Sequence, residues 1–201
     1  MAEVGQPAMR RYLALRSDHV VAQGFWIITF AFFTAVGAQL EIPHQPVPYT
    51  FQTFFVLLAG GLLGKRNGFL SMMAYVGLGA AGLPVFAGSS FGIARVFGPS
   101  GGYLVSFPFA AYLIGFLISM QPESDDRPGG AMRKSATSFA WTTGSMIIGL
   151  VFIFAVGTLQ LNAVYFHNWT TSFLSGFLIF SWWDVLKLMA AAAICKSLDR
   201  S

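Results

Sequence analysis

Long apolar stretches dominate this chain and constrain its fold more than any other feature of the sequence. A helix needs about 20 mostly apolar residues to cross the hydrocarbon core of a bilayer. Only 10% of the 201 residues are charged, whereas soluble domains average about 25%. We interpret six stretches as membrane-spanning helices, at about 20–40, 49–64, 68–83, 101–120, 135–162 and 170–196. The sequence therefore predicts an all-α integral membrane protein, a six-helix bundle in a single domain over residues 1–201.

The second and third stretches are the shortest of the six. Each has about 16 residues, or about 24 Å as helix, which falls short of a core of about 30 Å. They form either two crossings or one re-entrant hairpin. Lys65 and Arg66 lie between them, and cationic turns favour the cytoplasm, so we expect two crossings.

Basic residues set the predicted orientation. With a cytoplasmic N-terminus, only Arg95 of the 12 Lys and Arg residues falls in an outside loop, and Lys187 falls within the membrane. The inside segments hold Arg10, Arg11, Arg16, Lys65, Arg66, Arg127, Arg133, Lys134, Lys196 and Arg200. This bias places both termini in the cytoplasm and the protein in the cell membrane as a multi-pass protein. It also explains the pI of about 9.5 without a nucleic-acid partner.

Two predicted outside loops are less polar than solvated loops. The segment EIPHQPVP follows the first stretch, and its three prolines end the helix. The segment LPVFAGSSFGIARVFGPSGG, residues 83–102, is rich in glycine and still apolar. Irregular backbone at membrane depth is tolerated inside protein or beside a cavity. We interpret the two loops as the lid of an outward-facing pocket; the alternative is a pair of ordered connectors.

Asp184 and Lys187 interrupt the last apolar stretch. Each costs about 2.5–3.5 kcal/mol near the centre of a membrane helix, and such residues usually mark a substrate or ion path. Three residues apart, they lie on one helix face. The alternatives are a self-neutralising ion pair, or a Lys187 that snorkels to the surface. The adjacent Trp183 is either an interface anchor or a pocket wall.

Ala31 and Ala35 stand four residues apart in the first stretch. Small residues at this spacing let helices approach closely, within one chain or between chains. The sequence contains no HExxH zinc motif, no GxxxxGK[ST] phosphate loop and no GxSxG elbow. We therefore expect neither an enzyme, nor a metal site, nor an ATPase.

Three segments together resemble a known family: PVPYTFQTFFVLLAGGLLGKRNGFLSMMAYVGLGAAGLPVFAG, GPSGGYLVSFPFAAYLIG and WWDVLKL. They are similar to the BioY family, the biotin-specific substrate-binding (S) components of energy-coupling factor (ECF) transporters. The resemblance covers residues 31–188 and is most specific over 46–115. The family commonly has GPTGGY where this chain has Ser100; both residues offer a hydroxyl.

The resemblance implies a six-helix membrane bundle with both termini inside and a biotin site that opens outward under the two loops. It implies that Asp184 and Lys187 contribute to that site. It also implies that Ala31 and Ala35 meet the transmembrane T component, which works with separate ATPases. Biotin and membrane lipid complete the expected partners; no cofactor is expected, and homo-oligomerisation is left open.

The groups of biotin indicate which residues suit each part of such a site. An ionised Asp184 can accept from a ureido N–H and Lys187 can donate to an oxygen. Apolar parts of biotin need apolar or aromatic walls, for which the candidates are Tyr75, Phe86, Tyr103 and Trp183. Other candidates are Gln52 and Thr53 for neutral hydrogen bonds, Gly88, Ser89 and Gly92 for backbone contacts, and Arg95 for the carboxylate. The alternatives are an ordinary surface charge for Arg95 and helix packing for Tyr75 and Phe86.

Three other functions compete with an ECF S component. A solitary biotin carrier would use the same pocket without partners. A membrane enzyme would use Asp184 and Lys187 as acid and base, but no nucleophile or metal set accompanies them. A structural subunit would bind no ligand.

Overall fold

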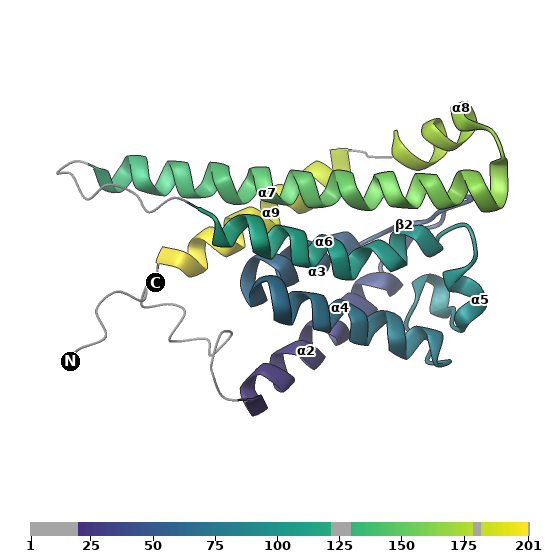
Figure 1. Ribbon diagram of the computed structural model, residues 1–201, viewed down its shortest axis with the longest axis horizontal. Coiled ribbons are helices and arrows are strands. Elements are labelled where there is room, and N and C mark those ends of the chain that lie inside the picture. Colours follow the sequence, from purple (N-terminus) through teal and green to yellow (C-terminus); the bar gives the residue numbers. More distant parts are fainter. Residues whose placement is uncertain (1–19, 122–129, 179–181, 201) are drawn as a thin grey trace.

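Helices make up most of the structure, as the apolar stretches predict. The computed structural model describes residues 20–121, 130–178 and 182–200 (Figure 1). Its α-helices are α2 (Val20–Gln39), α3 (Gln52–Leu58), α4 (Gly64–Ala80), α5 (Ile93–Val96), α6 (Gly101–Ser119), α7 (Gly130–Leu161), α8 (Trp169–Ser172) and α9 (Trp182–Arg200). Turns of π-helix occur at η1 (Ala59–Leu63), η3 (Asn162–Phe166) and η4 (Phe173–Phe177), and a 3₁₀ turn at η2 (Ala87–Ser89). The strands β1 (Glu41–Ile42) and β2 (Tyr49–Thr50) pair antiparallel.

Three helices in the described residues are long and apolar enough to cross a membrane. They are Val20–Gln39, Gly101–Ser119 and Ser138–Phe166. A fourth candidate is the pair Trp169–Phe177 and Trp182–Leu198, whose halves meet at 46°. The predicted span 170–196 is therefore a bent pair and not one straight helix. The count of six crossings stays a prediction.

The predicted second and third spans form a helical hairpin. α3 continues into η1, and the chain then turns at Gly64, whose φ of +75° suits glycine. Gly68 brings α4 against η1, since a Cβ there would lie 2.9 Å from the Ala59 carbonyl oxygen. The second span begins at Gln52, and not at residue 49, because residues 49–50 pair as β2 with β1. The 17 residues of α4 give about 25 Å, short of a core of about 30 Å.

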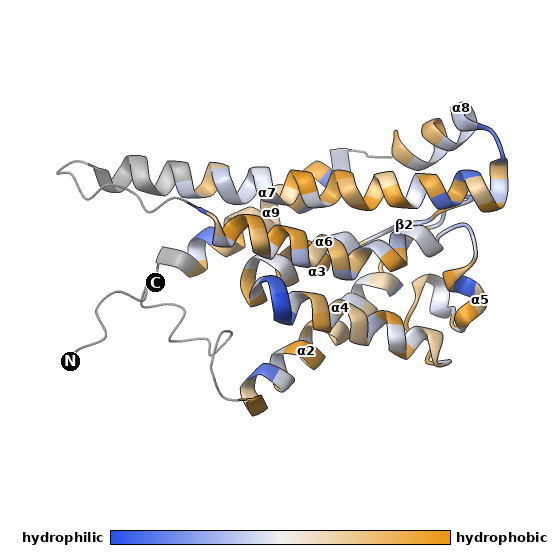
Figure 2. Ribbon diagram, in the orientation of Figure 1, coloured by the Kyte–Doolittle hydropathy of each residue, from blue (hydrophilic) through white to orange (hydrophobic). Residues whose placement is uncertain are grey.

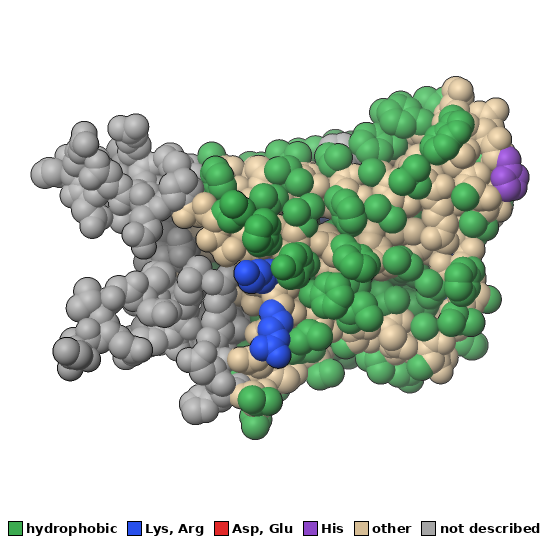
Figure 3. Space-filling model, in the orientation of Figure 1, with side chains coloured by type: hydrophobic (Ala, Val, Ile, Leu, Met, Phe, Trp, Pro, Cys, Tyr) green, Lys and Arg blue, Asp and Glu red, His purple; other side chains and the backbone are tan. Residues whose placement is uncertain are grey.

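The described surface is the inverse of a water-soluble protein's surface. Phe25 and Phe32 are 63% and 62% exposed, whereas Asp184 and Lys187 are 4% and 6% exposed. Apolar residues run along most of the helices (Figure 2). On the face in Figure 3 they cover most of the described surface, and the Lys and Arg side chains lie toward the end at which α2 begins. Buried charges under exposed aromatic residues fit a hydrocarbon surrounding.

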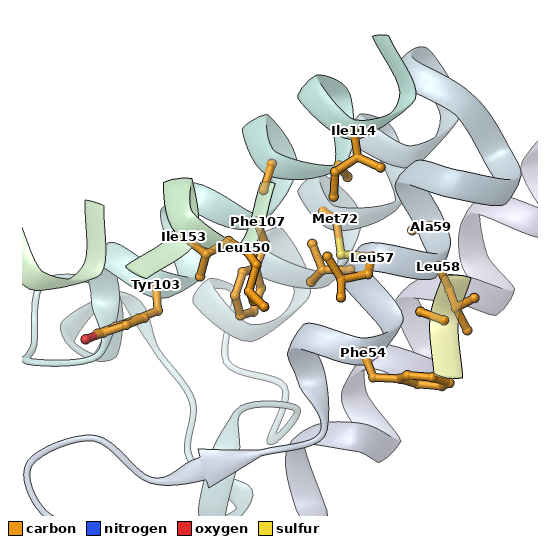
Figure 4. Close-up of a cluster of buried hydrophobic side chains, with 14 of the residues drawn as sticks. Phe54, Leu57, Leu58, Ala59, Met72, Tyr103, Phe107, Ile114, Leu150 and Ile153 are labelled. Atoms are coloured by element: carbon orange, nitrogen blue, oxygen red, sulfur yellow. The ribbon is translucent and has the colours of Figure 1, made fainter. Parts of the chain in front are cut away.

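The helices pack around an apolar core at the centre of the bundle. Leu57 and Met72 come from α3 and α4, and they meet Phe107 of α6 and Leu150 of α7 (Figure 4). Tyr103 lies at one edge of this cluster and points its hydroxyl away from it. The core therefore holds α6 and α7 in place on one side of the site described below.

The two ends of the bundle differ in structure. β2, α5 and α8 lie at one end, while α2 begins and α9 ends toward the other (Figure 1). The two predicted lid loops, 41–48 and 83–102, therefore share an end. Seven basic residues of the charge count lie outside the residues whose side chains are described: Arg10, Arg11, Arg16, Arg127, Arg133, Lys134 and Arg200.

Candidate substrate-binding site

A cavity lies beneath the two predicted lid loops. It encloses about 650 Å³ between its lining atoms, open space at its mouth included. The lining comes from both loops and from α3, α6, α7 and α9: Val47, Pro48, Tyr49, Thr50, Gln52, Thr53, Phe86, Ala87, Arg95, Ser100, Tyr103, Leu104, Phe107, Phe154, Asp184 and Lys187. A few polar groups converge on largely apolar walls, which is typical of a site for a small organic molecule.

Lys187 is a buried cross-link at this cavity. Its Nζ lies 2.6 Å from Asp184 Oδ1 and donates at 2.9 Å both to the Thr50 carbonyl oxygen and to Thr53 Oγ1. An ammonium has three N–H donors, so all three are engaged. The ion pair that the sequence offered as an alternative is present, and Lys187 does not snorkel to the surface. Its two further bonds join α9 to β2 and to α3.

A second set of polar contacts connects the two loops. The Thr50 hydroxyl donates to Gln52 Oε1 at 2.8 Å, and Gln52 Nε2 donates to the Tyr75 hydroxyl. The Tyr75 hydroxyl in turn donates to the Val85 carbonyl oxygen at 3.2 Å. Buried polar groups such as these are costly to leave unpaired. The contacts therefore favour one arrangement of the first loop, α4 and the second loop.

Aromatic side chains form the cavity's apolar walls. The Phe86 ring packs edge-on against Tyr75 with centroids 5.6 Å apart, and Tyr75 stacks on Phe107 at 6.5 Å. Tyr103 meets Phe154 edge-on at 6.0 Å. Its hydroxyl donates to the Gly176 carbonyl oxygen at 2.9 Å, which fixes the ring. Of these rings, Phe86, Tyr103, Phe107 and Phe154 line the cavity and offer flat surfaces to an apolar ligand.

Arg95 is the second cation of the cavity lining. It is half-buried on α5, and its guanidinium makes no hydrogen bond or ion pair within the part of the chain that the structure describes. A guanidinium with open donors matches the geometry of a carboxylate. The cavity can therefore accept an anionic group at this position.

The structure brings most of the predicted site residues together, at different depths. Seven line the cavity: Gln52, Thr53, Phe86, Arg95, Tyr103, Asp184 and Lys187. Tyr75 lies one layer behind, between Gln52 and Phe86. Gly88, Ser89 and Gly92 belong to the second loop but do not line the cavity. Trp183 also lies outside the lining; it is 43% exposed and stacks on Trp182 at 4.2 Å.

Several lining residues were absent from the sequence-based set. Phe107 lies four residues after Tyr103 and three after Leu104, and residues at such spacings share a helix face, so this signal was available. Tyr49 and Thr50 follow the prolines of the first loop and join the lining as β2. Phe154 of α7 carried no local signal, since one phenylalanine among many on an apolar helix resembles any other.

The small residues of α2 do not form an open surface. Ala31 is 2% exposed, and Ala35 is half-buried. α2 crosses α4 here: the Ser71 hydroxyl donates to the Ile27 carbonyl oxygen at 2.8 Å, and Thr34 Oγ1 lies 3.8 Å from Met72 Sδ. Ile27, Ala31 and Thr34 share a helix face. The structure therefore shows Ala31 packed within the chain, the alternative that the sequence left open.

Comparison with known proteins identifies the family. A profile of the BioY family matches residues 9–201. This chain belongs to the BioY family. Among its BioY relatives, the biotin transporter BioY of Thermotoga maritima is 41% identical over 177 residues, which is 87% of this chain and 95% of the relative. The probable biotin transporter BioY of Pyrococcus horikoshii is 37% identical, over 86% of this chain and 93% of the relative.

A solved structure shares the fold. The crystal structure of the S-component for biotin from an ECF-type ABC transporter superposes with a TM-score of 0.76 at 28% identity, covering 90% of this chain and 92% of that one. The resemblance to BioY proteins is therefore confirmed, in sequence and in fold. This BioY chain is a multi-pass membrane protein of mostly helical structure.

Proposed function

We propose that this BioY-family chain takes up biotin as the membrane-embedded S component of an ECF transporter. It is a transporter subunit and not an enzyme. The observation that carries the proposal is the loop-capped cavity, in which a buried Asp184–Lys187 pair faces aromatic walls. Biotin presents the matching parts: a polar ureido ring, an apolar thioether ring and chain, and a carboxylate. Capture and release make and break no covalent bond, so the proposal includes no cofactor.

The proposed topology has six crossings and cytoplasmic termini in the cell membrane. The crossings are α2, α3 with η1, α4, α6, α7, and the bent pair that ends with α9. Successive helices run in opposite directions along the bundle, and α4 begins at the end where α2 begins (Figure 1). Lys65 and Arg66 stand in the first turn of α4, and basic residues favour the cytoplasmic side. The cavity then opens to the outside.

The proposed pose of biotin places its ureido ring at Asp184 and its carboxylate at Arg95. An ionised carboxylate can accept from a ureido N–H, and such charge-assisted bonds are strong. The apolar parts would then lie against Phe86 and Tyr103. Because the three donors of Lys187 are already engaged, Lys187 gives a bond to biotin only by releasing one acceptor. In this pose the main role of Lys187 is therefore to hold Asp184 and the first loop in position, and not to contact biotin.

In this proposal, uptake by the chain draws on an external source of energy. Its sequence contains no phosphate-binding loop of the GxxxxGK[ST] type, so a T component and separate ATPases supply the energy in our proposal. Docking through α2 stays a prediction. Ala35 is half-buried, and Ala31 becomes available to a partner only if α2 shifts away from α4.

Titration of biotin into the purified chain tests the proposal. We expect one-to-one binding by the wild type and binding about 10–150-fold weaker in Asp184→Asn, the loss of one hydrogen bond to a charged group. Lys196→Gln is the control: its ammonium lies 4.9 Å from the Phe139 ring centroid, outside the cavity. Absence of binding by a folded wild type would overturn the proposal. Unchanged affinity in Asp184→Asn would remove that residue from the site.

Transport measured with and without partners separates an S component from a solitary carrier. In vesicles, biotin uptake should require the T component and ATPases. Ala31→Leu should abolish uptake and leave binding intact if α2 moves to dock. Full uptake by the isolated chain would instead establish the solitary carrier.

A further inference from the structure

Gln39, the last residue of α2, reaches across to the second lid loop. Its Nε2 donates to the Phe86 carbonyl oxygen at 3.1 Å. Its Oε1 accepts at 3.1 Å from the Ser89 backbone N–H and, also at 3.1 Å, from the Ser89 hydroxyl. Three contacts of this one side chain thus join the end of α2 to residues that lie 47 and 50 positions further along the sequence.

The segment that Gln39 binds has a strained backbone. Ser89 has φ of +54° and follows Gly88, whose φ is +65°. A left-handed conformation costs a non-glycine residue on the order of 1–3 kcal/mol and persists only where its surroundings hold it. Both donors of Ser89 point to the same Gln39 oxygen in this conformation. Gln39 therefore stabilises a turn that would otherwise relax.

That turn carries a wall of the cavity. Phe86 lines the cavity, and its backbone is bonded on both sides. Its N–H donates to the Ser90 carbonyl oxygen across the turn, and its own carbonyl oxygen accepts from Gln39. The Phe86 ring packs against Tyr75 and leaves no room for a side chain at Gly79, where a Cβ would lie 2.1 Å from the ring. Tyr75 thus holds the Phe86 ring inside the protein, and Gln39 holds the Phe86 backbone at the rim of the cavity.

Gln39 also stands next to the first lid loop. Glu41, two residues later, begins β1 and pairs with Thr50, whose carbonyl oxygen accepts from Lys187. A carboxylate oxygen of Glu41 lies 3.3 Å from the position that a Cβ on Gly88 would occupy. The end of α2 is therefore the place where the two loops meet.

We propose that Gln39 is a positioning residue that fastens the second loop to α2 and so keeps the cavity closed over its substrate. The inference rests on the proposed function, biotin capture in this cavity. Gln39 is exposed at the rim and touches no cavity-lining side chain through its own amide. It acts on the bound molecule through Phe86, by limiting how often the wall swings away.

Dissociation kinetics of biotin test this role. We expect Gln39→Leu to raise koff roughly ten-fold with little change in kon, the effect of losing rim contacts of modest net strength. The koff of Gln39→Glu should lie between those of the wild type and Gln39→Leu, because its carboxylate keeps the bonds from Ser89 but cannot donate to Phe86. Adding Ser89→Ala to Gln39→Leu should raise koff no further. The control is Thr29→Val, which removes a hydroxyl that bonds within α2, at 2.8 Å to the Phe25 carbonyl oxygen.

Hydrogen exchange on the ligand-free protein gives a second readout. The Ser89 amide should exchange faster in Gln39→Leu than in the wild type, with the melting temperature unchanged. A purely structural role would instead lower the melting temperature and change kon and koff together, and that result overturns the proposal.

The two proposals fail in different ways. Unchanged koff and unchanged Ser89 exchange in Gln39→Leu would overturn the role of Gln39 while leaving biotin binding intact. A folded wild type that does not bind biotin overturns the proposed function. The exchange measurement still decides in that case whether Gln39 holds the loop.

Discussion

Lys187→Met should destabilise the protein far more than the loss of a single hydrogen bond. Methionine keeps lysine's unbranched chain as far as Cε but removes all three donors, including the one 2.6 Å from Asp184. Asp184, 4% exposed, then loses the ammonium that it pairs with. Removing one partner of a buried ion pair costs about 3–5 kcal/mol. For a protein of this size 1 kcal/mol shifts Tm by about 2–4 °C, so we expect a fall of about 6–20 °C.

The double variant Lys187→Met/Asp184→Asn distinguishes a buried charge from lost packing. It removes both charges, and replacing a whole buried pair with neutral groups is often nearly neutral in stability. We expect it to recover more than half of the lost Tm, measured by tryptophan fluorescence in one detergent. Lys196→Met is the control, since a partly exposed cation–π contact is worth about 0.5–1 kcal/mol.

Two results would refute this reasoning. A melting temperature unchanged in Lys187→Met would mean that the three contacts of the ammonium contribute nothing net. A double variant as unstable as the single one would mean that packing, and not the buried charge, dominates. Biotin binding should be weak in both variants, so the recovery concerns stability alone.

The remaining predictions concern glycines at close contacts. A Cβ on Gly115 would lie 2.3 Å from the Lys65 backbone nitrogen, so Gly115→Ala should cost about 1–3 kcal/mol as overpacking does. Gly144→Ala is its control, with nothing within 4 Å, and its Tm should stay equal or rise; equal Tm values for the two variants would contradict the prediction. Gly79→Ala should displace the buried Phe86 ring, lower Tm as overpacking does, and weaken biotin binding about ten-fold; unchanged affinity in titration of the folded variant would exclude Phe86 as a wall.

The sequence identified the charged pair at the site because such a pair is costly in a membrane helix. Asp184 and Lys187 stand out against an apolar background, and their spacing puts them on one face. The other partners of Lys187 could not be inferred in this way. Thr50 and Thr53 lie 137 and 134 residues away, and no local pattern connects threonines of β2 and α3 to a lysine of the last helix.

Residues whose role depends on helix rotation were the hardest to predict. The spacing of Ala31 and Ala35 indicates a close helix approach, and it does not say whether α4 or another protein makes it. In the structure, α4 packs against the face of α2 that contains Ala31. Trp183 precedes Asp184 directly, and neighbours one apart point to different sides of a helix. With Asp184 facing the cavity, Trp183 is turned outward onto Trp182.

The two lid loops are held by contacts of unequal strength, and this difference predicts which loop opens first. The first loop is held by Lys187, through a buried charged donor at 2.9 Å from Thr50. The second is held by neutral contacts: at the rim by Gln39 at 3.1 Å, where water can replace the bonds, and inside by the Tyr75 hydroxyl, 3.2 Å from the Val85 carbonyl oxygen. Hydrogen bonds to charged groups contribute about 1.5–3 kcal/mol and neutral ones about 0.5–1.5 kcal/mol. The second loop should therefore open first, and amide exchange at Ser89 should be faster than at Thr50 in the same ligand-free sample.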